Sequence, residues 1–254
     1  MKLTTIGTGS RGNCYLLTSQ TGETLIIEAG MPYSEVAKTI GAAASGIVGC
    51  IISHEHRDHC AYTLDYIKQG IDCYMNQSTF ESLTRHKAIS IIDGEIINSG
   101  QIFKVGNFTI MALEVEHDAP CLMFLVQHSE LGKLVYLTDT QYSKWRYNNV
   151  DVFMVEANYD RSIVEQRIEE ASKTEDTREE LTLRMRLKRL SQTHMEINTT
   201  IDFLQANREH NPMCKVILIH TSCENASPAD FKLRAQRATG RQVYIAEKGQ
   251  EIEL

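Results

Sequence analysis

Short apolar runs recur along this chain and repeatedly end in polar residues, and apolar residues return at helical spacing in the segments between them. Runs of about four to eight apolar residues predict strands, whereas apolar positions three and four residues apart predict helices. The predicted strands are 2–6, 14–18, 24–28, 48–53, 72–75, short strands within 91–105, 108–116, 122–127, 134–138, 151–157, 216–219 and 242–246. The predicted helices are 34–44, 62–68, 77–86, two within 161–191 joined by a solvated link at 169–176, 196–206 and 228–239.

The predicted strands form two clusters that helices interrupt. This order favours an α/β protein in which two mixed sheets pack together, with helices on both outer faces. A chain of 254 residues is long enough to bury a sizeable core as one large domain. We therefore expect a single domain over residues 1–254.

Composition and charge narrow the class of protein. The net charge of −7 argues against a protein that grips long nucleic acid through a general positive field. A small anionic substrate remains compatible, because bound metal ions supply local positive charge. The seven cysteines form no CxxC pair, which favours buried free thiols in a reducing compartment. With no apolar run long enough for a signal peptide or a membrane span, we expect a cytoplasmic protein without a membrane partner.

The candidate chemistry is concentrated in the stretch His54-Glu55-His56-Arg57-Asp58-His59, which directly follows an apolar strand. Strand alternation places His54 and His56 on the same side, and a turn can fold Asp58 and His59 back toward them. Neutral imidazoles with a carboxylate are the ligand set that suits zinc and similar divalent ions. One ion does not need all four groups, so the stretch indicates two ions about 3.5–4 Å apart.

Other predicted strands also end in polar residues that can serve a site. His117, Asp139 and His220 each follow an apolar run directly, and Asn158 does the same. Glu28 ends another run, where a carboxylate can hold a ligating histidine from outside the metal's first layer of ligands. Sites in layered α/β proteins gather at the carboxyl ends of strands. We therefore expect these side chains to lie together.

Two further segments suit an anionic ligand. Loop 7–13 either lies against an anion with its exposed N–H groups or is a plain hairpin loop. The helix before His194 either attracts a phosphate with its basic residues or presents a solvated face docked by leucines. His194 itself either serves the substrate or is a surface residue. The basic residues of that helix are Arg184, Arg186, Lys188 and Arg189.

The order Glu-Ala-Gly, His-x-His-x-Asp-His, His, Asp, His resembles the metallo-β-lactamase fold superfamily over nearly the whole chain. The resemblance implies an αββα four-layer sandwich with two divalent ions, zinc first and manganese as the alternative. It assigns the first ion to His54, His56 and His117, and the second to Asp58, His59 and His220. It makes Asp139 the bridge between the ions. The superfamily usually has Asp where this chain has Glu28.

Further motifs narrow the resemblance to two groups within the superfamily. Segments 12–17, 137–140, 156–160 and 243–249 resemble two groups, the YycJ/WalJ-like nucleases and the phage anti-Pycsar phosphodiesterases. The second group degrades cyclic mononucleotide signals and so evades anti-phage defence. Tyr159 and the stretch Thr193-His194-Met195 are more similar to that second group. The resemblance also implies a homodimer.

We therefore predict a metal-dependent phosphodiesterase that hydrolyses small cyclic nucleotides, with a metal-bridging hydroxide that attacks phosphorus. Asp58 orients the nucleophile, and His194 contacts the phosphate or protonates the leaving oxygen. Ser10, Asn13 and Asn158 are candidate substrate contacts. The alternatives are a single-strand DNA exonuclease that uses the basic helix, a thioester or other carbonyl hydrolase, and a metal-stabilised binding protein without catalysis.

Overall fold

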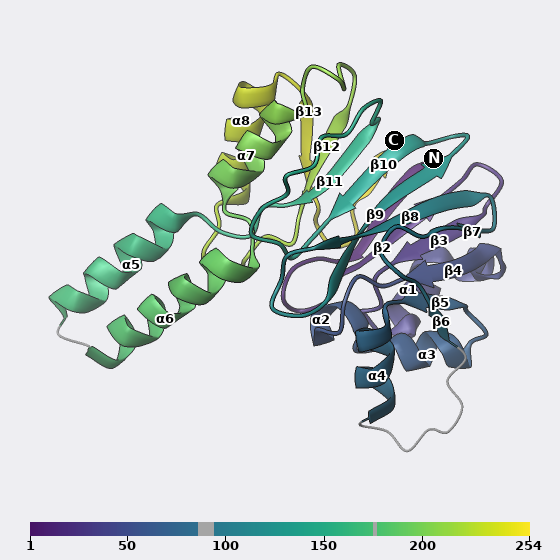
Figure 1. Ribbon diagram of the computed structural model, residues 1–254, viewed down its shortest axis with the longest axis horizontal. Helices are drawn as coiled ribbons and strands as arrows, with labels where there is room; N and C mark the ends of the chain where they lie inside the picture. The colour runs from purple at the N-terminus through teal and green to yellow at the C-terminus, as the bar shows by residue number, and fades with distance from the viewer. Residues whose placement is uncertain (86–93, 175–176) are drawn as a thin grey trace.

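Two seven-stranded sheets pack face to face in the computed structural model of the protein (Figure 1). The structure describes residues 1–85, 94–174 and 177–254. The strand order is β14-β1-β2-β3-β4-β5-β6 in the first sheet and β13-β12-β11-β10-β9-β8-β7 in the second. In each sheet, three antiparallel pairings adjoin three parallel ones. Both sheets are therefore mixed, and the predicted fold class is confirmed.

The strands are short and mostly coincide with the predicted runs. Those of the first sheet are β1 (Lys2–Gly7), β2 (Cys14–Thr18), β3 (Thr24–Ile27), β4 (Ile47–Ile51), β5 (Cys73–Met75), β6 (Gly94–Ile96) and β14 (Glu251–Glu253). Those of the second are β7 (Ile102–Val105), β8 (Phe108–Val115), β9 (Cys121–His128), β10 (Gly132–Leu137), β11 (Val152–Glu156), β12 (Lys215–Ile219) and β13 (Gln242–Ile245).

Helices cover both outer faces of the sandwich (Figure 1). The first sheet is covered by α1 (Tyr33–Ile40), α2 (Arg57–Cys60), α3 (Thr63–Lys68) and α4 (Gln77–Arg85), with a 3-10 turn at Gly41–Gly46. The second sheet is covered by α7 (Ile197–Ala206) and α8 (Pro228–Thr239). A hairpin of α5 (Arg161–Lys173) and α6 (Thr177–Thr193) projects from the sandwich. None of these helices is long and apolar enough to cross a membrane.

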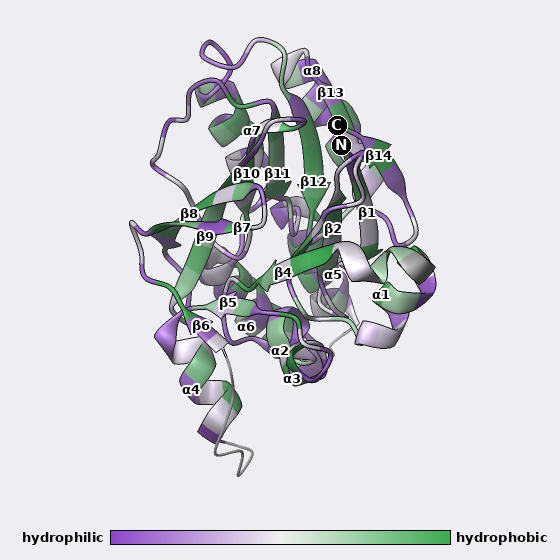
Figure 2. Ribbon diagram, turned by 90° about the vertical axis from the view of Figure 1, so that its right-hand side faces the viewer, coloured by the Kyte–Doolittle hydropathy of each residue, from purple (hydrophilic) through white to green (hydrophobic). Residues whose placement is uncertain are grey.

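The main core lies between the sheets and is built from buried apolar residues of both. Figure 2 colours much of the length of the strands as hydrophobic. Aromatic residues of both sheets meet there, since the ring centroids of Tyr15 and Tyr136 are 6.0 Å apart. Two further apolar clusters lie under the outer helices, and a fourth holds the α5–α6 hairpin together through Leu183, Leu187 and Leu190. The leucine stripe predicted for the basic helix therefore docks that helix on its partner.

The structure differs from the prediction at a few elements. The solvated link expected at 169–176 is wrong in its first part, because α5 continues to Lys173. Ala171 is buried against α6 and Lys173 pairs with Glu169 at 2.8 Å, and both contacts favour helix. β14 and the single turn of α2 were not predicted. The predicted ends at residue 86 and at 91–93 lie outside the described residues.

Gly30 determines how closely two loops of the site approach each other. The Asn13 N–H donates to the carbonyl oxygen of Asp58 at 2.7 Å, and the Gly30 N–H donates to the carbonyl of Asn13 at 2.9 Å. A Cβ at Gly30 would collide with that Asp58 carbonyl oxygen and lie 2.6 Å from the Asn13 nitrogen. Backbone atoms cannot move aside as a flexible side chain can. Only glycine therefore permits this packing.

We expect Gly30→Ala to displace the backbone of Asp58 and to lower the free energy of unfolding by about 1–3 kcal/mol. Zinc content after dialysis should fall together with stability, because Asp58 is a candidate ligand. Gly94→Ala is the matched control, since its Cβ would meet only side-chain atoms, at 3.3 Å or more. Denaturant unfolding and metal analysis measure both effects. A Gly30→Ala protein with normal stability and zinc content would contradict the expectation.

Candidate metal centre

Six strands deliver polar side chains to one edge of the sandwich. Glu28, His54, His117, Asp139 and His220 follow β3, β4, β8, β10 and β12, and Glu156 ends β11. Glu28, Asp139 and His220 have positive φ values of 70°, 43° and 55°. Among the described residues, Asn149 is the one other non-glycine residue with a positive φ. This backbone conformation costs free energy for a residue with a Cβ, so strain is concentrated at the site.

The first candidate ligand group consists of His54, His56, His117 and Asp139, whose ligand atoms all lie within 4.8 Å of one another. Asp139 Oδ2 is 3.5 Å from His54 Nε2 and 3.8 Å from His117 Nε2. His117 Nε2 is 3.2 Å from His56 Nδ1. The structure therefore brings together the residues that the sequence assigned to the first ion.

The second group consists of Asp58, His59, Asp139 and His220 at the same mutual spacing. His59 Nε2 is 3.4 Å from both Asp58 Oδ2 and Asp139 Oδ2, and His220 Nε2 is 3.1 Å from Asp58 Oδ2. Asp139 belongs to both groups. This is the arrangement expected of a carboxylate that bridges two ions.

The chemistry of these side chains fits a bound cation. His54 Nε2 is buried and has no hydrogen-bond partner, which is costly unless an ion supplies one. Burial, with the neighbouring His59, holds the pKa of His54 well below its usual value, so this imidazole is neutral. Burial opposes ionisation of Asp139, but His220 and His59 outweigh it and hold the pKa of Asp139 well below its usual value. Burial lowers the pKa of His59 and His220, but Asp139 and other neighbouring carboxylates outweigh it and raise both pKa values, so a bound ion would replace protons on these two histidines. Neutral His54 and ionised Asp139 already have the forms that divalent metal ions bind.

Glu28 takes part in the site, although its side chain is longer than that of the aspartate usual at its position. Its Oε1 lies 3.3 Å from His59 Nδ1, and its Oε2 accepts a hydrogen bond from the Ser53 N–H at 3.2 Å. Both Glu28 and His59 are fully buried. Glu28 thus contacts the nitrogen of His59 that faces away from Asp58 and Asp139, where a carboxylate orients the ring.

Glu156 serves two histidines in the same way and was not among the predicted site residues. Its Oε1 lies 2.7 Å from His194 Nδ1 and 3.0 Å from His220 Nδ1. Its Oε2 accepts hydrogen bonds from the N–H groups of Met195 and Thr140. The signal was available, because Glu156 ends an apolar strand as the other site residues do.

Asp118 is a second residue that the sequence reasoning missed. Its Oδ1 lies 3.3 Å from His56 Nε2 and 3.1 Å from His117 Nε2, and its Oδ2 lies 3.8 Å from Arg189. Its place directly after His117 was the only signal. Asp118 therefore adds negative charge beside the first ligand group.

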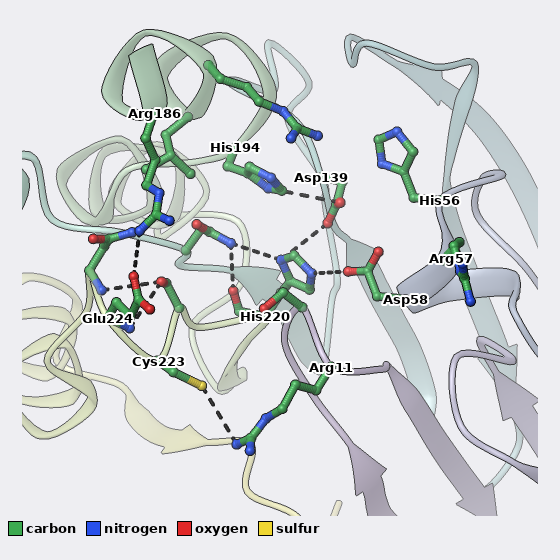
Figure 3. A pocket seen from close by; sticks show the side chains of 16 residues that line it. Arg11, His56, Arg57, Asp58, Asp139, Arg186, His194, His220, Cys223 and Glu224 are labelled. Carbon is green, nitrogen blue, oxygen red and sulfur yellow. Dashed lines mark hydrogen bonds and ion pairs between the residues drawn. The ribbon is translucent and has the colours of Figure 1, made fainter. Parts of the chain in front are cut away.

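A cavity of about 670 Å³ opens over the two groups, and its lining includes Asp58, Asp139 and His220 (Figure 3). Figure 3 shows Arg186 and Arg11 on opposite sides of the His220 and Asp58 side chains. The basic helix contributes Arg186 and Arg189 to the lining, while Arg11 comes from the loop before β2 and Arg57 is the first residue of α2. Arginine side chains therefore surround the candidate metal centre.

The three predicted substrate contacts do not all line the cavity. Ser10 and Asn158 line the cavity. Asn13 is buried beneath it, where its side chain donates to the Asp58 carbonyl at 3.3 Å and lies 3.2 Å from His59 Nε2. Asn158 also donates to the carbonyl oxygen of His220 at 3.0 Å. Asn13 and Asn158 thus support the backbone of two candidate ligands.

His194 follows the C-terminus of α6 and lines the cavity, with 15% of its side chain exposed. Burial lowers the pKa of His194, but the charge and hydrogen bond of Glu156 outweigh it and raise the pKa above its usual value. Its Nδ1 is engaged by Glu156. The geometry therefore leaves Nε2 as the nitrogen for another partner.

The fold and the site together define a metal-dependent hydrolase of the αββα class. The chain belongs to the beta-lactamase superfamily domain family, whose model matches residues 28–221. Exodeoxyribonuclease YycJ of Bacillus anthracis is 27% identical over an alignment of 165 residues, and the match covers 61% of this chain and 62% of that relative. The chain thus matches just under two thirds of the relative's length.

Solved structures share the fold at low identity. The metallo-β-lactamase fold protein YhfI from Bacillus subtilis superposes with a TM-score of 0.74 at 19% identity, covering 99% of both chains. Zinc-bound PqqB from Methylobacterium extorquens superposes with a TM-score of 0.69 at 10% identity, covering 100% of both chains. At these identities, the likeness establishes the fold.

We expect Glu156→Gln to lower zinc affinity about 10- to 100-fold, because the amide keeps the shape of the side chain but removes the charge that orients His220. Competition with a coloured chelator measures this affinity. Glu165→Gln is the control, since Glu165 is exposed on α5 and pairs with Arg161 on the same helix. Unchanged zinc affinity in Glu156→Gln would show that this carboxylate does not support the metal centre.

Proposed function

We propose that the protein is a phosphodiesterase that hydrolyses small cyclic nucleotides with the help of two zinc ions. The observation that carries this proposal is the pair of ligand groups that share Asp139 at the floor of an arginine-lined cavity. A zinc-bound protein of the same fold, PqqB, supports the choice of metal. Manganese is the alternative ion.

The arginine side chains favour a phosphate group over an uncharged carbonyl. Arginine matches the geometry of phosphate oxygens with two parallel donors. Arg186 pairs with Glu224 and Arg189 lies near Asp118, so neither is neutralised by a buried partner. A thioester or lactam carbonyl would not require this concentration of cations, and the carbonyl hydrolase alternative is therefore less supported.

Charge and size favour a small substrate. The net charge of −7 opposes the counterion-driven binding on which proteins that hold long nucleic acid depend. A volume of about 670 Å³ is in the range of cavities that hold one small ligand. A cyclic mononucleotide carries one phosphodiester charge and is small enough to place its phosphate in this cavity.

The residues of the chain provide the remaining chemistry. When bound, two divalent ions make water acidic enough to act as a nucleophile near neutral pH and offset charge on the phosphoryl oxygens. The Asp58 carboxylate, which is partly exposed to the cavity, accepts a hydrogen bond from the attacking water and orients it. The attacking water loses a proton to the solvent, its oxygen bonds to phosphorus, the bond to the leaving oxygen breaks, and His194 Nε2 gives a proton to that oxygen.

A single-strand DNA exonuclease is the second candidate, and one observation favours it. The relative with 27% identity is an exodeoxyribonuclease. A nuclease of this kind would need a groove that follows several phosphates, to which Arg186 and Arg189 of α6 contribute. The chemistry at phosphorus would be the same.

A substrate panel distinguishes these candidates. We expect zinc-loaded protein to hydrolyse cyclic mononucleotides to nucleoside monophosphates and to release little mononucleotide from labelled single-stranded DNA. The rate with a cyclic nucleotide should fall only weakly with salt, whereas binding to DNA falls steeply because many counterions are released. Chromatography of the products measures both activities. Turnover of DNA with none of the cyclic nucleotides would replace the first candidate with the second.

We expect Arg186→Ala to raise the KM for the cyclic nucleotide about tenfold, since it removes a cation from the cavity and leaves Glu224 paired with Arg167 alone. Arg184→Ala is a matched control on the same helix, because Arg184 pairs with Glu180 and does not line the cavity. Steady-state kinetics measure the difference. Equal KM values for the two variants would exclude Arg186 from phosphate binding.

A further inference from the structure

A second cavity, of about 680 Å³, lies on the other side of the candidate metal centre. His117 and Asp118 form one wall, and Asp118 separates the two cavities because it contacts His56 on one side and lies near Arg189. The loop between β10 and β11 forms the opposite wall. This second cavity begins at a candidate ligand of the first ion.

The two cavities differ in charge. Four arginines and three carboxylates line the first, whereas Lys144 is the only lysine or arginine among the residues that line the second. Glu114 and Glu116 join Asp118 in the second, so that three carboxylates face one ammonium group. A phosphate is therefore favoured in the first cavity and disfavoured in the second. The second cavity suits an uncharged part of the same substrate.

Two exposed aromatic side chains mark the second cavity. Trp145 is 45% exposed and Tyr142 is 52% exposed, and both line it. Trp145 is the single tryptophan of the chain, and Lys144 Nζ lies 5.3 Å from the centroid of its ring. Exposed aromatic surface beside a site is available for a ligand. Every nucleobase has a flat face that stacks on such a ring.

The loop that carries these rings is held at both ends. At its start, the Thr140 N–H donates to Glu156, and the Thr140 hydroxyl donates to the Tyr142 carbonyl at 3.0 Å. At its end, the Tyr147 N–H donates to Asn207 at 2.7 Å. Asp139 begins the same loop. The position of Trp145 is thus tied to that of the shared carboxylate.

We propose that the second cavity is a base-binding subsite, in which Trp145 and Tyr142 stack on the nucleobase while the arginines of the first cavity hold the phosphate. This inference rests on the proposed nucleotide substrate and adds the location of its base. The step is one of binding, so Trp145 affects KM rather than the chemistry at phosphorus.

Fluorescence of the single tryptophan tests the subsite directly. We expect adenosine 5′-monophosphate to quench the emission of zinc-loaded protein to a saturating level, and inorganic phosphate to leave it unchanged. In kinetics, Trp145→Ala should raise the KM for the cyclic nucleotide about tenfold with kcat changed less than about twofold, and Trp145→Phe should restore most of the loss. Arg146→Ala is the control, since Arg146 is exposed on the same loop outside the lining.

The outcomes separate this inference from the proposed function. Saturable quenching without turnover of cyclic nucleotides would support the base subsite and count against the phosphodiesterase. Turnover without quenching, and with the same KM in Trp145→Ala as in Arg146→Ala, would overturn the subsite and leave the phosphodiesterase in place. Neither quenching nor turnover would overturn both.

Discussion

A buried carboxylate stays ionised only if cations or hydrogen-bond donors surround it, and Asp139 is placed under that constraint. It is almost fully buried, and four histidines approach its oxygens within 3.8 Å, with His194 at 4.0 Å. These histidines come from different segments of both sheets. The two sheets must therefore pack with these segments close together around Asp139 for the site to form.

Backbone strain accompanies this convergence. Glu28, Asp139 and His220 all leave their strands in a left-handed conformation, which turns each side chain toward the centre rather than along its strand. The glycine at position 30 lets the neighbouring loops touch through their backbones. The burial of apolar residues on both faces of each sheet offsets the free-energy cost of these unfavourable backbone conformations.

Carboxylates outside the two ligand groups complete the design of the site. Glu28 contacts the outer nitrogen of His59, and Glu156 contacts those of His194 and His220. Each contact fixes which ring nitrogen faces the centre. Asp118 and the arginines of α6 then divide the surroundings into a basic cavity and an acidic, aromatic one. The two cavities therefore differ in charge, which is the property by which the proposed subsites would divide a nucleotide.

The local pattern of the sequence predicted most strands and the candidate metal ligands. Apolar runs predicted the strands of both sheets, and the residues at their ends included the members of both ligand groups, because strand periodicity and metal-ligand chemistry are properties of short segments. The structure places His54, His117, Asp139 and His220 together as their positions at strand ends implied.

Only the tertiary structure decided what surrounds these residues. Glu156 and Asp118 contact the histidines because distant strands and loops meet, and no local spacing encodes that meeting. The burial of Asn13, the entry of Arg186 into one cavity and the placing of Trp145 in another depend on the packing of a loop or helix against the sandwich. The ligand types follow from short-range sequence, whereas the substrate's surroundings arise from long-range contacts.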